Sequence, residues 1–378
     1  MLTISFNMTS QTGNTSYGTN ALSDNFSGEY NSAFGYQSMQ GNNISGDHNT
    51  ALGVSALRFL TSGQYNTALG SFSLYTNTTG AQNVGIGYYS LFTNTAYGNT
   101  AVGYYSLKEN TTGMYNVSIG HSSLTDNTTG EYNTASGAFS LNKNTTGNYN
   151  TSNGAFSLNK NTTGVHNSAG GYASLYKNTT GNYNSAFGYQ SLYDNTTGQY
   201  NTALGKNALL NITTGSSNTA VGYSANASSS TAINQTVIGY QADGQADNSV
   251  VLGNSDVTAV YMAEDSGATI YAGNATFNGD VVIQSDARLK SNIVSLGSTL
   301  NKLLQIDGKS YEMKGRQKIG VLAQDIQELF PELVTVDDNE MLAVNYQGLV
   351  PVLINAIKEQ QKEIDELKGV LQKLVNTK

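Results

Sequence analysis

The 378-residue chain contains no cysteine and no tryptophan, and only two of its residues are proline. The absence of cysteine excludes a disulfide framework, a thiolate metal site and a cysteine nucleophile. Charged residues make up 12% of the chain against a typical ~25%, and the net charge of −8 argues against a nucleic-acid partner. No apolar run reaches the roughly 18 residues of a membrane span, and residues 1–6 lack the basic and long apolar regions of a signal peptide. We therefore expect a protein made in a cytoplasm, without insertion into a membrane.

The composition divides near residue 285. Residues 1–284 hold 19 charged residues, six basic and 13 acidic, whereas the last 94 residues hold 25. Both prolines, Pro331 and Pro351, lie in the last part, while 23 of the 25 tyrosines lie in the first. Two different kinds of polypeptide are joined end to end, and each needs its own interpretation.

The long first part is a tandem repeat with a period of 17 residues. Its consensus, Y-N-T-A-x-G-x-x-S-L-x-x-N-T-T-G-x, is clear in residues 65–74 and again in residues 200–209. The segment Asn-Thr-Thr-Gly occurs seven times, and turn chemistry explains it. Self-similarity at a fixed period is the signature of a solenoid, whose stacked units share one core. The key glycine recurs in steps of 16 to 18 residues, at Gly18, Gly35, Gly53, Gly70, Gly87, Gly103, Gly120, Gly137, Gly154, Gly171, Gly188, Gly205, Gly222 and Gly239.

Each repeat favours β structure over helix. Gly and Asn interrupt the unit every six to nine residues, and Thr, Tyr, Val and Ile fill the gaps. Because Gly tolerates positive φ and Asn tolerates the left-handed region, both residues suit tight corners. We expect one coil of two short strands and two corners, with Ala68, Leu69, Leu74 and their equivalents in the core. At ~4.8 Å per coil, the stack would form a rod about 65 Å long.

The constant period places like residues above one another. Asparagines are expected to hydrogen-bond along the axis in one ladder, formed by Asn116, Asn133, Asn150, Asn167, Asn184 and Asn201. A second ladder is aromatic; its stacked rings would stabilise the solenoid or, alternatively, bind sugar rings on an exposed face. Its members are Tyr115, Tyr132, Tyr149, His166, Tyr183 and Tyr200.

The blocks Asn-Ser/Thr-Ala-x-Gly-x-x-Ser resemble the head repeats of trimeric autotransporter adhesins, although the period here is longer. Those heads are β-rolls assembled as trimers. After an N-terminal segment of residues 1–17, the resemblance implies a mainly β, trimeric β-solenoid or β-roll fibre over residues 18–239.

Beyond residue 239 the period breaks, because Gly253 follows Gly239 by only 14 residues. Residues 240–284 contain short apolar runs between glycines and are interpreted as a β-rich neck. Residues 285–346 mix helical and extended patterns, which predict a small α+β unit. We expect helices at residues 300–304 and 325–330, and strands at residues 309–313, 318–324, 333–336 and 342–346.

Residues 347–378 have the heptad pattern of a coiled-coil helix. The a and d positions are apolar apart from Gln360, which we expect to set the register. Ile at a with Leu at d would alone favour two strands, so the trimer prediction rests on the family resemblances. The predicted seam contains Val350, Leu353, Ile357, Gln360, Ile364, Leu367, Leu371 and Leu374.

Five motifs follow one another in the last part: S-D-A-R-L-K-S-N-I at 285–293, Y-E-M at 311–313, I-G-V-L-A-Q-D-I at 319–326, F-P-E-L-V at 330–334 and V-N-Y-Q-G-L-V-P-V-L-I-N-A-I-K-E at 344–359. With the terminal coiled coil, they resemble the endosialidase-type C-terminal intramolecular chaperone. That family ends phage tail fibres, tailspikes and neck appendages, and it also occurs in the myelin regulatory factors. The resemblance implies that this unit trimerises its parent β-fibre and then cuts itself off with a Ser-Lys dyad.

Ser285 and Lys290 fall on the two positions of the dyad, with the expected spacing of five. A lysine removed from water can lose its proton near neutral pH and act as the base for a serine hydroxyl. Ser285 would attack the carbonyl of Gln284 to give an ester that water hydrolyses; alternatively, the bond to Asp286 is cut. Arg288 or backbone N–H groups would support the oxyanion. We expect one self-cleavage per chain, no other catalytic activity, no cofactor and no bound metal.

The resemblance implies a homotrimeric virion tail-fibre or spike-like protein for host attachment, made in the host cytoplasm. Its expected partners are other virion proteins and a host cell-surface receptor or glycan. Two alternatives stay open: a cellular surface adhesin or exoprotein with the same chaperone, and a tailspike that degrades polysaccharide. A groove with paired carboxylates would favour the tailspike.

The repeats themselves explain why such a chaperone is useful. Nearly identical coils can pair out of register by one coil with little penalty. A C-terminal unit that trimerises first would fix the three chain ends in register, and the rod would then form from that end.

Overall fold

The computed structural model describes residues 12–262, 275, 280–281, 285–313, 315–337 and 340–376. The chain divides into two compact units, residues 1–269 and residues 270–378, and each unit is described by itself. Among the described residues, no helix combines the length and the apolar character needed to cross a bilayer.

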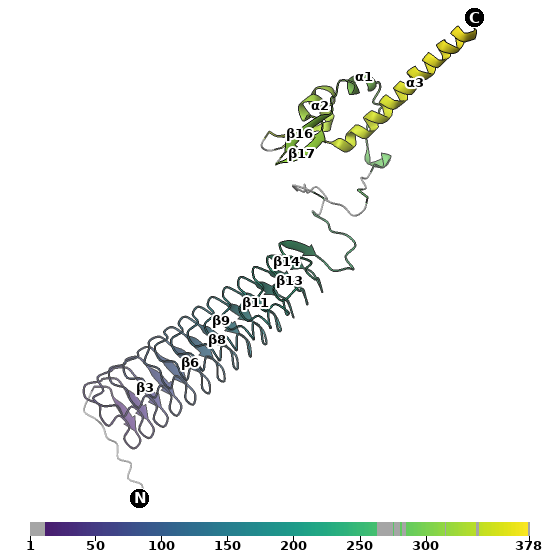
Figure 1. Cartoon of the computed structure of the whole chain (residues 1–378). Coiled ribbons are helices and arrows are strands. Elements are labelled where there is room, and N and C mark those ends of the chain that lie inside the picture. Colours follow the sequence, from purple (N-terminus) through teal and green to yellow (C-terminus); the bar gives the residue numbers. More distant parts are fainter. Residues whose placement is uncertain are drawn as a thin grey trace. The chain divides into compact units, whose positions relative to one another are not determined.

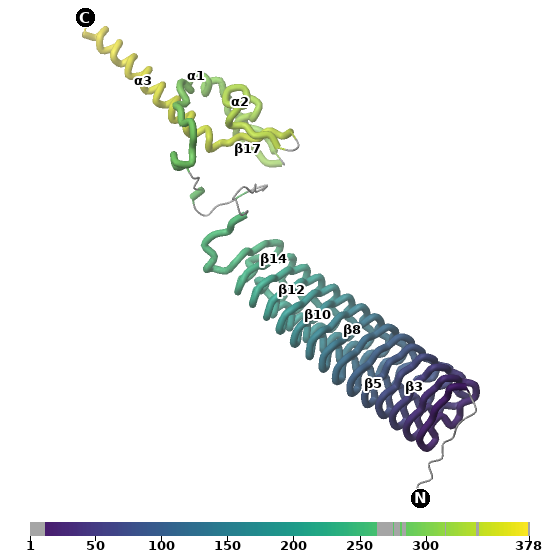
Figure 2. Tube along the Cα trace, turned by 180° about the vertical axis from the view of Figure 1, so that it is seen from behind, coloured from purple at the N-terminus to yellow at the C-terminus, as the bar shows by residue number. Residues whose placement is uncertain are grey.

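The first unit is a β-solenoid built on one parallel sheet of 15 strands in chain order, which confirms the predicted fold (Figures 1 and 2). Each strand pairs in register with the strand of the next coil, so that Thr134 lies beside Thr151. The sheet continues through β14 and β15, into the segment predicted as a neck. The strands are β1 Thr15–Tyr17, β2 Ser32–Phe34, β3 Thr50–Leu52, β4 Thr67–Leu69, β5 Val84–Ile86, β6 Thr100–Val102, β7 Val117–Ile119, β8 Thr134–Ser136, β9 Thr151–Asn153, β10 Ser168–Gly170, β11 Ser185–Phe187, β12 Thr202–Leu204, β13 Thr219–Val221, β14 Gln235–Ile238 and β15 Ser249–Leu252.

The other side of each coil is a series of turns, so the prediction of a second strand is wrong. Gly137 (φ 133°), Phe139 (φ 58°) and Leu141 (φ 49°) all have positive φ, which a strand does not contain. Their N–H groups still find partners in neighbouring coils: that of Phe139 bonds to the His121 carbonyl and that of Leu141 to the Ser157 carbonyl, at 2.9 and 3.0 Å. Glycine is required at the first position, because a methyl group on Gly137 would lie 2.6 Å from the carbonyl carbon of the next coil's glycine.

The apolar part of the core is narrow, and in a typical coil it contains two residues of the repeat. Ala68, the middle residue of its strand, and Leu74, from the turn side, are both fully buried. Leu69 was expected beside them but is 41% exposed, because alternate strand residues face opposite sides of the sheet. Leu74 has a φ of 51°, a conformation that costs a non-glycine residue about 1–3 kcal/mol. Burial of a leucine side chain stabilises by a similar amount, ~1.5–3 kcal/mol, and offsets that strain.

The predicted asparagine ladder is present and fully buried. The side-chain amide of Asn133 donates to the Oδ1 of Asn116 at 3.1 Å and to the Gly147 carbonyl at 2.8 Å. Its Oδ1 accepts a hydrogen bond from the backbone N–H of Asn150 at 3.0 Å. Each coil is therefore tied to the next by side-chain as well as backbone hydrogen bonds.

A second buried asparagine ladder comes from the Asn-Thr-Thr-Gly segments. The Nδ2 of Asn144 donates to the Oδ1 of Asn127 at 2.8 Å and to the Gly147 carbonyl at 2.9 Å. The prediction for this motif was limited to turn chemistry. Its strict recurrence was the signal that could have identified a ladder.

The predicted aromatic ladder is also present. From Tyr115 to Tyr200, successive rings are stacked with centroids 4.8 to 5.2 Å apart, and His166 takes one position in the stack. Neighbouring coils therefore interact through rings on the surface as well as through amides in the core.

The second unit is small and not repetitive, as predicted (Figure 1). Two antiparallel pairs, β16–β17 and β18–β19, accompany short helices around a core of Ile326, Phe330, Leu333 and Val352. The strand predicted over residues 318–324 ends at Gly320, because α2 begins at Ala323. The elements are η1 Ala287–Leu289, α1 Leu300–Leu303, β16 Lys309–Met313, β17 Arg316–Gly320, α2 Ala323–Leu329, η2 Pro331–Leu333, β18 Val334–Val336, β19 Leu342–Val344, η3 Tyr346–Gly348 and α3 Leu349–Asn376.

Candidate functional site

Ser285 and Lys290 lie in contact across a single helical turn. The turn is η1, and the carboxylate of Asp286 caps it by accepting a hydrogen bond from the backbone N–H of Arg288 at 2.8 Å. Because the turn folds the chain back, Lys290 Nζ lies 2.6 Å from Ser285 Oγ. The structure thus brings together a hydroxyl and an amine at the distance that proton transfer requires.

Arg288 is directed to Asp286. Its guanidinium donates to both carboxylate oxygens, from Nε at 3.1 Å and from NH2 at 2.6 Å. The Arg288 guanidinium and backbone N–H hold the pKa of the Asp286 carboxyl below its ordinary value, and the Asp286 carboxylate raises the pKa of Arg288. In a single chain, this guanidinium therefore stabilises the turn between the dyad residues.

The dyad is exposed within one chain. Both Ser285 and Lys290 are open to solvent, whereas lysines that act as bases are usually shielded from water. Gln284, on the other side of the expected cleavage point, lies outside the described residues. The described residues of the C-terminal unit thus leave the dyad open to solvent.

Glu359 joins the long helix α3 to the segment that follows the dyad. Its carboxylate accepts hydrogen bonds from the Ser298 hydroxyl at 2.7 Å and from the backbone N–H groups of Thr299 and Leu300 at 2.6 and 3.2 Å. These donors, the Ser298 hydroxyl foremost, hold the pKa of Glu359 below its ordinary value. The N-terminus of α1 is therefore held by a side chain of α3, a contact that the sequence pattern did not indicate.

Helix α3 uses two different faces. Val352 and Ala356 are buried against the rest of the unit, and the Thr299 hydroxyl also bonds to the Val352 carbonyl at 3.0 Å. The predicted seam is a separate stripe that one chain leaves uncovered. Its exposed apolar members are Val350, Leu353, Ile357, Ile364, Leu367, Leu371 and Leu374.

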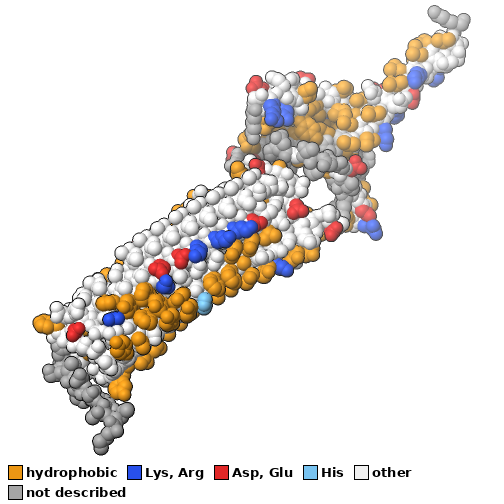
Figure 3. Space-filling view, turned by 60° about the horizontal axis from the view of Figure 1, so that its bottom comes forward, with side chains coloured by type: hydrophobic (Ala, Val, Ile, Leu, Met, Phe, Trp, Pro, Cys, Tyr) orange, Lys and Arg blue, Asp and Glu red, His pale blue; other side chains and the backbone are white. Residues whose placement is uncertain are grey.

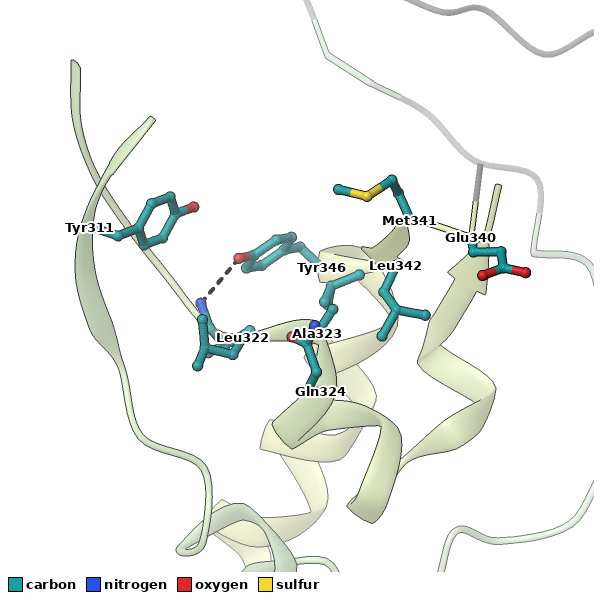
Figure 4. A pocket seen from close by; sticks show the side chains of 10 residues that line it. Tyr311, Leu322, Ala323, Gln324, Glu340, Met341, Leu342 and Tyr346 are labelled. Carbon is teal, nitrogen blue, oxygen red and sulfur yellow. Dashed lines mark hydrogen bonds between the residues drawn. The ribbon is translucent and has the colours of Figure 1, made fainter. Parts of the chain in front are cut away.

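An open cleft of about 490 Å³ lies beside the β17–α2 connection (Figure 4). Tyr311 and Tyr346 point toward one another across it, and the Tyr346 hydroxyl accepts a hydrogen bond from the Val321 backbone N–H at 3.1 Å. Leu322 and Leu342 line the cleft as well. Neither dyad residue is part of its lining, so the cleft is distinct from the site at Ser285.

The rod carries a band of exposed and half-buried surface rings that the sequence pattern did not reveal. Figure 3 shows hydrophobic side chains gathered beside a row of charged side chains. Rings from three different positions of the repeat interleave here, so no single 17-residue register indicates the band. This aromatic band comprises Phe72, Tyr75, Tyr88, Tyr89, Phe92, Tyr104, Tyr105, His121, Phe139, Phe156, Tyr172, Tyr176, Tyr189 and Tyr193.

Charged side chains occupy one position of six successive repeats, at Glu109, Asp126, Lys143, Lys160, Lys177 and Asp194. Oppositely charged neighbours pair between coils, Lys143 with Asp126 at 2.8 Å and Lys177 with Asp194 at 2.7 Å. Within the described ranges, no three His, Asp or Glu side chains come together as a metal site.

Part of the second unit matches a known protein family. Residues 285–335 match the family described as "Chaperone of endosialidase". The match begins at Ser285 and includes Lys290. The chain therefore carries a C-terminal chaperone domain of the endosialidase type on a repeat rod.

The chain is also similar to phage proteins named "Long tail fiber protein Gp37". It is 33% identical over 150 residues to that of Enterobacteria phage K3, 34% over 125 residues to that of phage M1, and 33% over 137 residues to that of phage Ox2. These matches cover 33%, 30% and 33% of this chain, and 12%, 49% and 53% of the respective relatives. The chain thus spans between about an eighth and about half of the length of these relatives.

Proposed function

We propose that this chain is a virion structural protein, a homotrimeric phage tail fibre for host attachment, whose C-terminal domain trimerises the rod and then releases itself at Ser285. The observation that carries the proposal is the 2.6 Å contact between Lys290 Nζ and Ser285 Oγ, at the first residues of the chaperone domain. The similarity to long tail fibre proteins supports the virion role. Its partners would be other virion proteins and a receptor or glycan of the host.

The exposed apolar surfaces of both units support self-association. The seam of α3 is uncovered along its length, and Ile357 is 63% exposed. On the rod, the third residue of many strands forms an apolar row on the outer face of the sheet, including Leu52, Leu69, Ile119, Phe187 and Leu204. Because large exposed apolar patches mark interaction sites, we assign both surfaces to contacts between the three chains.

The chemistry would proceed in two steps. With its amine neutral, Lys290 takes the proton of Ser285 Oγ while the oxygen attacks the Gln284 carbonyl carbon. The C–O bond forms, the C–N bond to Ser285 breaks, and the freed amine takes up the proton, leaving an ester. Water then hydrolyses the ester, giving the Gln284 carboxylate and the free Ser285 hydroxyl. Backbone N–H groups would stabilise the oxyanion, and Arg288 would join them only after leaving Asp286.

Assembly would switch the reaction on. The dyad residues are in contact but exposed in one chain, and burial is what favours a neutral lysine. A trimer that covers Lys290 would therefore be active, whereas a lone chain would stay uncut. Cleavage would then report correct assembly, and loss of the chaperone would leave the rod kinetically trapped.

Intact-mass measurement of the purified full chain tests this function. We expect wild type to yield a C-terminal fragment of 94 residues if the Gln284–Ser285 bond is cut, or of 93 if the next bond is cut. Ser285→Ala and Lys290→Ala should remain full length. The exposed neighbours Ser291→Ala and Lys318→Ala serve as matched controls and should be cut like wild type. A folded wild-type trimer that stays full length, or cleavage in Ser285→Ala, would contradict the proposal.

A further inference from the structure

A hollow lies in the aromatic band beside Phe156. Phe139 and Phe156 stack with ring centroids 5.2 Å apart, and both have a φ near 58°. The equivalent residue of the next coil is Ala173, which is 3% exposed and has the same backbone conformation, with a φ of 53°. A missing ring, rather than a change of fold, therefore leaves the hollow, which measures about 160 Å³.

Two pairs of stacked rings form the walls of this hollow. On one side Tyr172 stacks on Tyr189 at 5.3 Å, and on the other Tyr176 stacks on Tyr193 at 5.2 Å. Phe156 closes one end, where it meets Tyr172 and Tyr176 edge-on at 5.8 and 6.5 Å. The result is a short trough with flat aromatic sides.

The trough also contains polar groups. Gln190 follows Ala173 along the floor and lines the hollow, and among the described residues its side-chain amide has no hydrogen-bond partner. Lys160 lies over the Tyr176 ring and Lys177 over the Tyr193 ring, each 5.3 Å from the centroid. Lys177 is in turn paired with Asp194 at 2.7 Å. The hollow thus combines aromatic walls with the amide of Gln190, and two lysines lie over wall rings.

We propose that this hollow binds one pyranose ring of a host-surface glycan. A sugar ring has an apolar face of C–H groups, which packs on aromatic faces, and hydroxyls around its edge, which need a polar partner such as the Gln190 amide. A volume of about 160 Å³ fits one ring and is smaller than the ~300–1,000 Å³ of sites for drug-sized ligands. The inference rests on the proposed function, because it names the chemistry by which the fibre recognises its host.

Two substitutions test the trough without disturbing the walls. Ala173→Phe continues the stack of Phe139 and Phe156 and fills the hollow. Gln190→Leu removes the floor amide. Their matched controls are Ser55→Phe and Gln37→Leu, which change the equivalent positions of distant coils, where φ is 55° and 57°.

The probes are the methyl glycosides of glucose, galactose and N-acetylglucosamine, each mixed with purified full-length protein. Saturation-transfer NMR should detect transfer from wild-type protein to at least one glycoside. We expect Ala173→Phe and Gln190→Leu to weaken this binding by about tenfold or more, and the two controls to match wild type. No transfer to any of the three glycosides, or transfer that Ala173→Phe leaves unchanged, would overturn the saccharide site.

A parallel assay separates this inference from the proposed function. The same proteins are tested for competition with a phage that adsorbs to the host bacterium. Competition by wild type without glycoside transfer would remove the saccharide site but keep the attachment function. Glycoside transfer without self-cleavage and without competition would keep the site and contradict the proposed function.

Discussion

The rod and the chaperone unit are stabilised in opposite ways. In the rod, the ladder contacts have copies one coil away: the bond from Asn133 to Asn116 is repeated from Asn150 to Asn133, at nearly the same distance. In the C-terminal unit each contact occurs once, as where Glu359 holds Ser298 and Thr299. Repeated contacts stabilise the rod but do not define the register in which the chains align, because a shift by one coil restores nearly all of these contacts. Contacts that occur only once define a single register, and this is why we assign alignment of the chains to the C-terminal unit.

The largest expected effect comes from the α3 seam. Ile357→Asp would place a charge in the centre of the coiled-coil contact, so we expect loss of the trimer and, with it, of self-cleavage. Light scattering for mass and intact-mass analysis for cleavage measure the two effects. Lys358→Asp, one residue away and off the seam, should remain trimeric and be cut. A trimeric, cleaved Ile357→Asp protein would contradict the assignment of trimer formation to the C-terminal unit.

A smaller effect is expected inside the rod. Asn150→Ala removes the acceptor of the Asn167 backbone N–H, a bond of 3.0 Å in a fully buried position. Each buried group left unpaired costs about 1–3 kcal/mol, and the trimer itself should persist. Denaturant unfolding of the released rod measures the loss. The matched control is Thr151→Ala on the exposed outer face of the sheet; equal stability of the two variants would argue against the ladder as a source of stability.

Surface rings should contribute less than buried amides. Tyr132 stacks between Tyr115 and Tyr149, at 5.2 and 5.1 Å, and aromatic pairs contribute about 0.5–1.5 kcal/mol beyond burial. Tyr132→Ala should therefore lower the unfolding free energy of the rod modestly. Tyr36→Ala, which removes a similarly exposed ring that has no stacking partner among the described residues, should have a smaller effect. The same loss in both variants would show that stacking adds nothing to the stability of the rod.

The smallest expected effect is a local loss of stability at low pH. The pKa of Glu359 is lowered in the folded unit. The hydrogen bonds from Ser298, Thr299 and Leu300 therefore stabilise the folded unit at pH above the pKa of the carboxyl in the unfolded chain, about 4.3. This stabilisation is lost as pH falls through the folded pKa. Hydrogen exchange at the amides of Thr299 and Leu300 should therefore lose protection in acid. Glu359→Gln should show weaker protection at pH 7 and a flatter pH dependence, and an unchanged profile would contradict the role of this carboxylate.

Most of the rod could be predicted from the sequence, because a strict period stacks the equivalent residues of successive repeats above one another. The aromatic column from Tyr115 and the asparagine column from Asn116 followed directly from spacing. Leu69 was misplaced because the repeat alone does not say which strand residues face inward. The second strand was wrong because positive φ at residues such as Leu141 is set by stacking between coils, which composition does not reveal.

The candidate site was predicted in part. The spacing of Ser285 and Lys290, with the family resemblance, anticipated that the two residues would meet. The pairing of Arg288 with Asp286 and the capping of α1 by Glu359 were not anticipated, since both depend on local turns and on packing between segments about 60 residues apart. The hollow at Ala173 was missed for a similar reason, because its walls come from different positions in successive coils.

The alignment role of the C-terminal unit is tested most directly by expressing residues 1–284 alone and comparing the product with the rod released from the full chain. Analytical ultracentrifugation should find the released rod as a soluble trimer, and the rod made alone as aggregates or mixed assemblies. A full chain lacking one whole coil, residues 144–160, is the control and should still give a soluble trimer, because the period is preserved. If residues 1–284 expressed alone formed the same uniform trimer, the rod would be able to align itself, and the alignment role of the C-terminal unit would be contradicted.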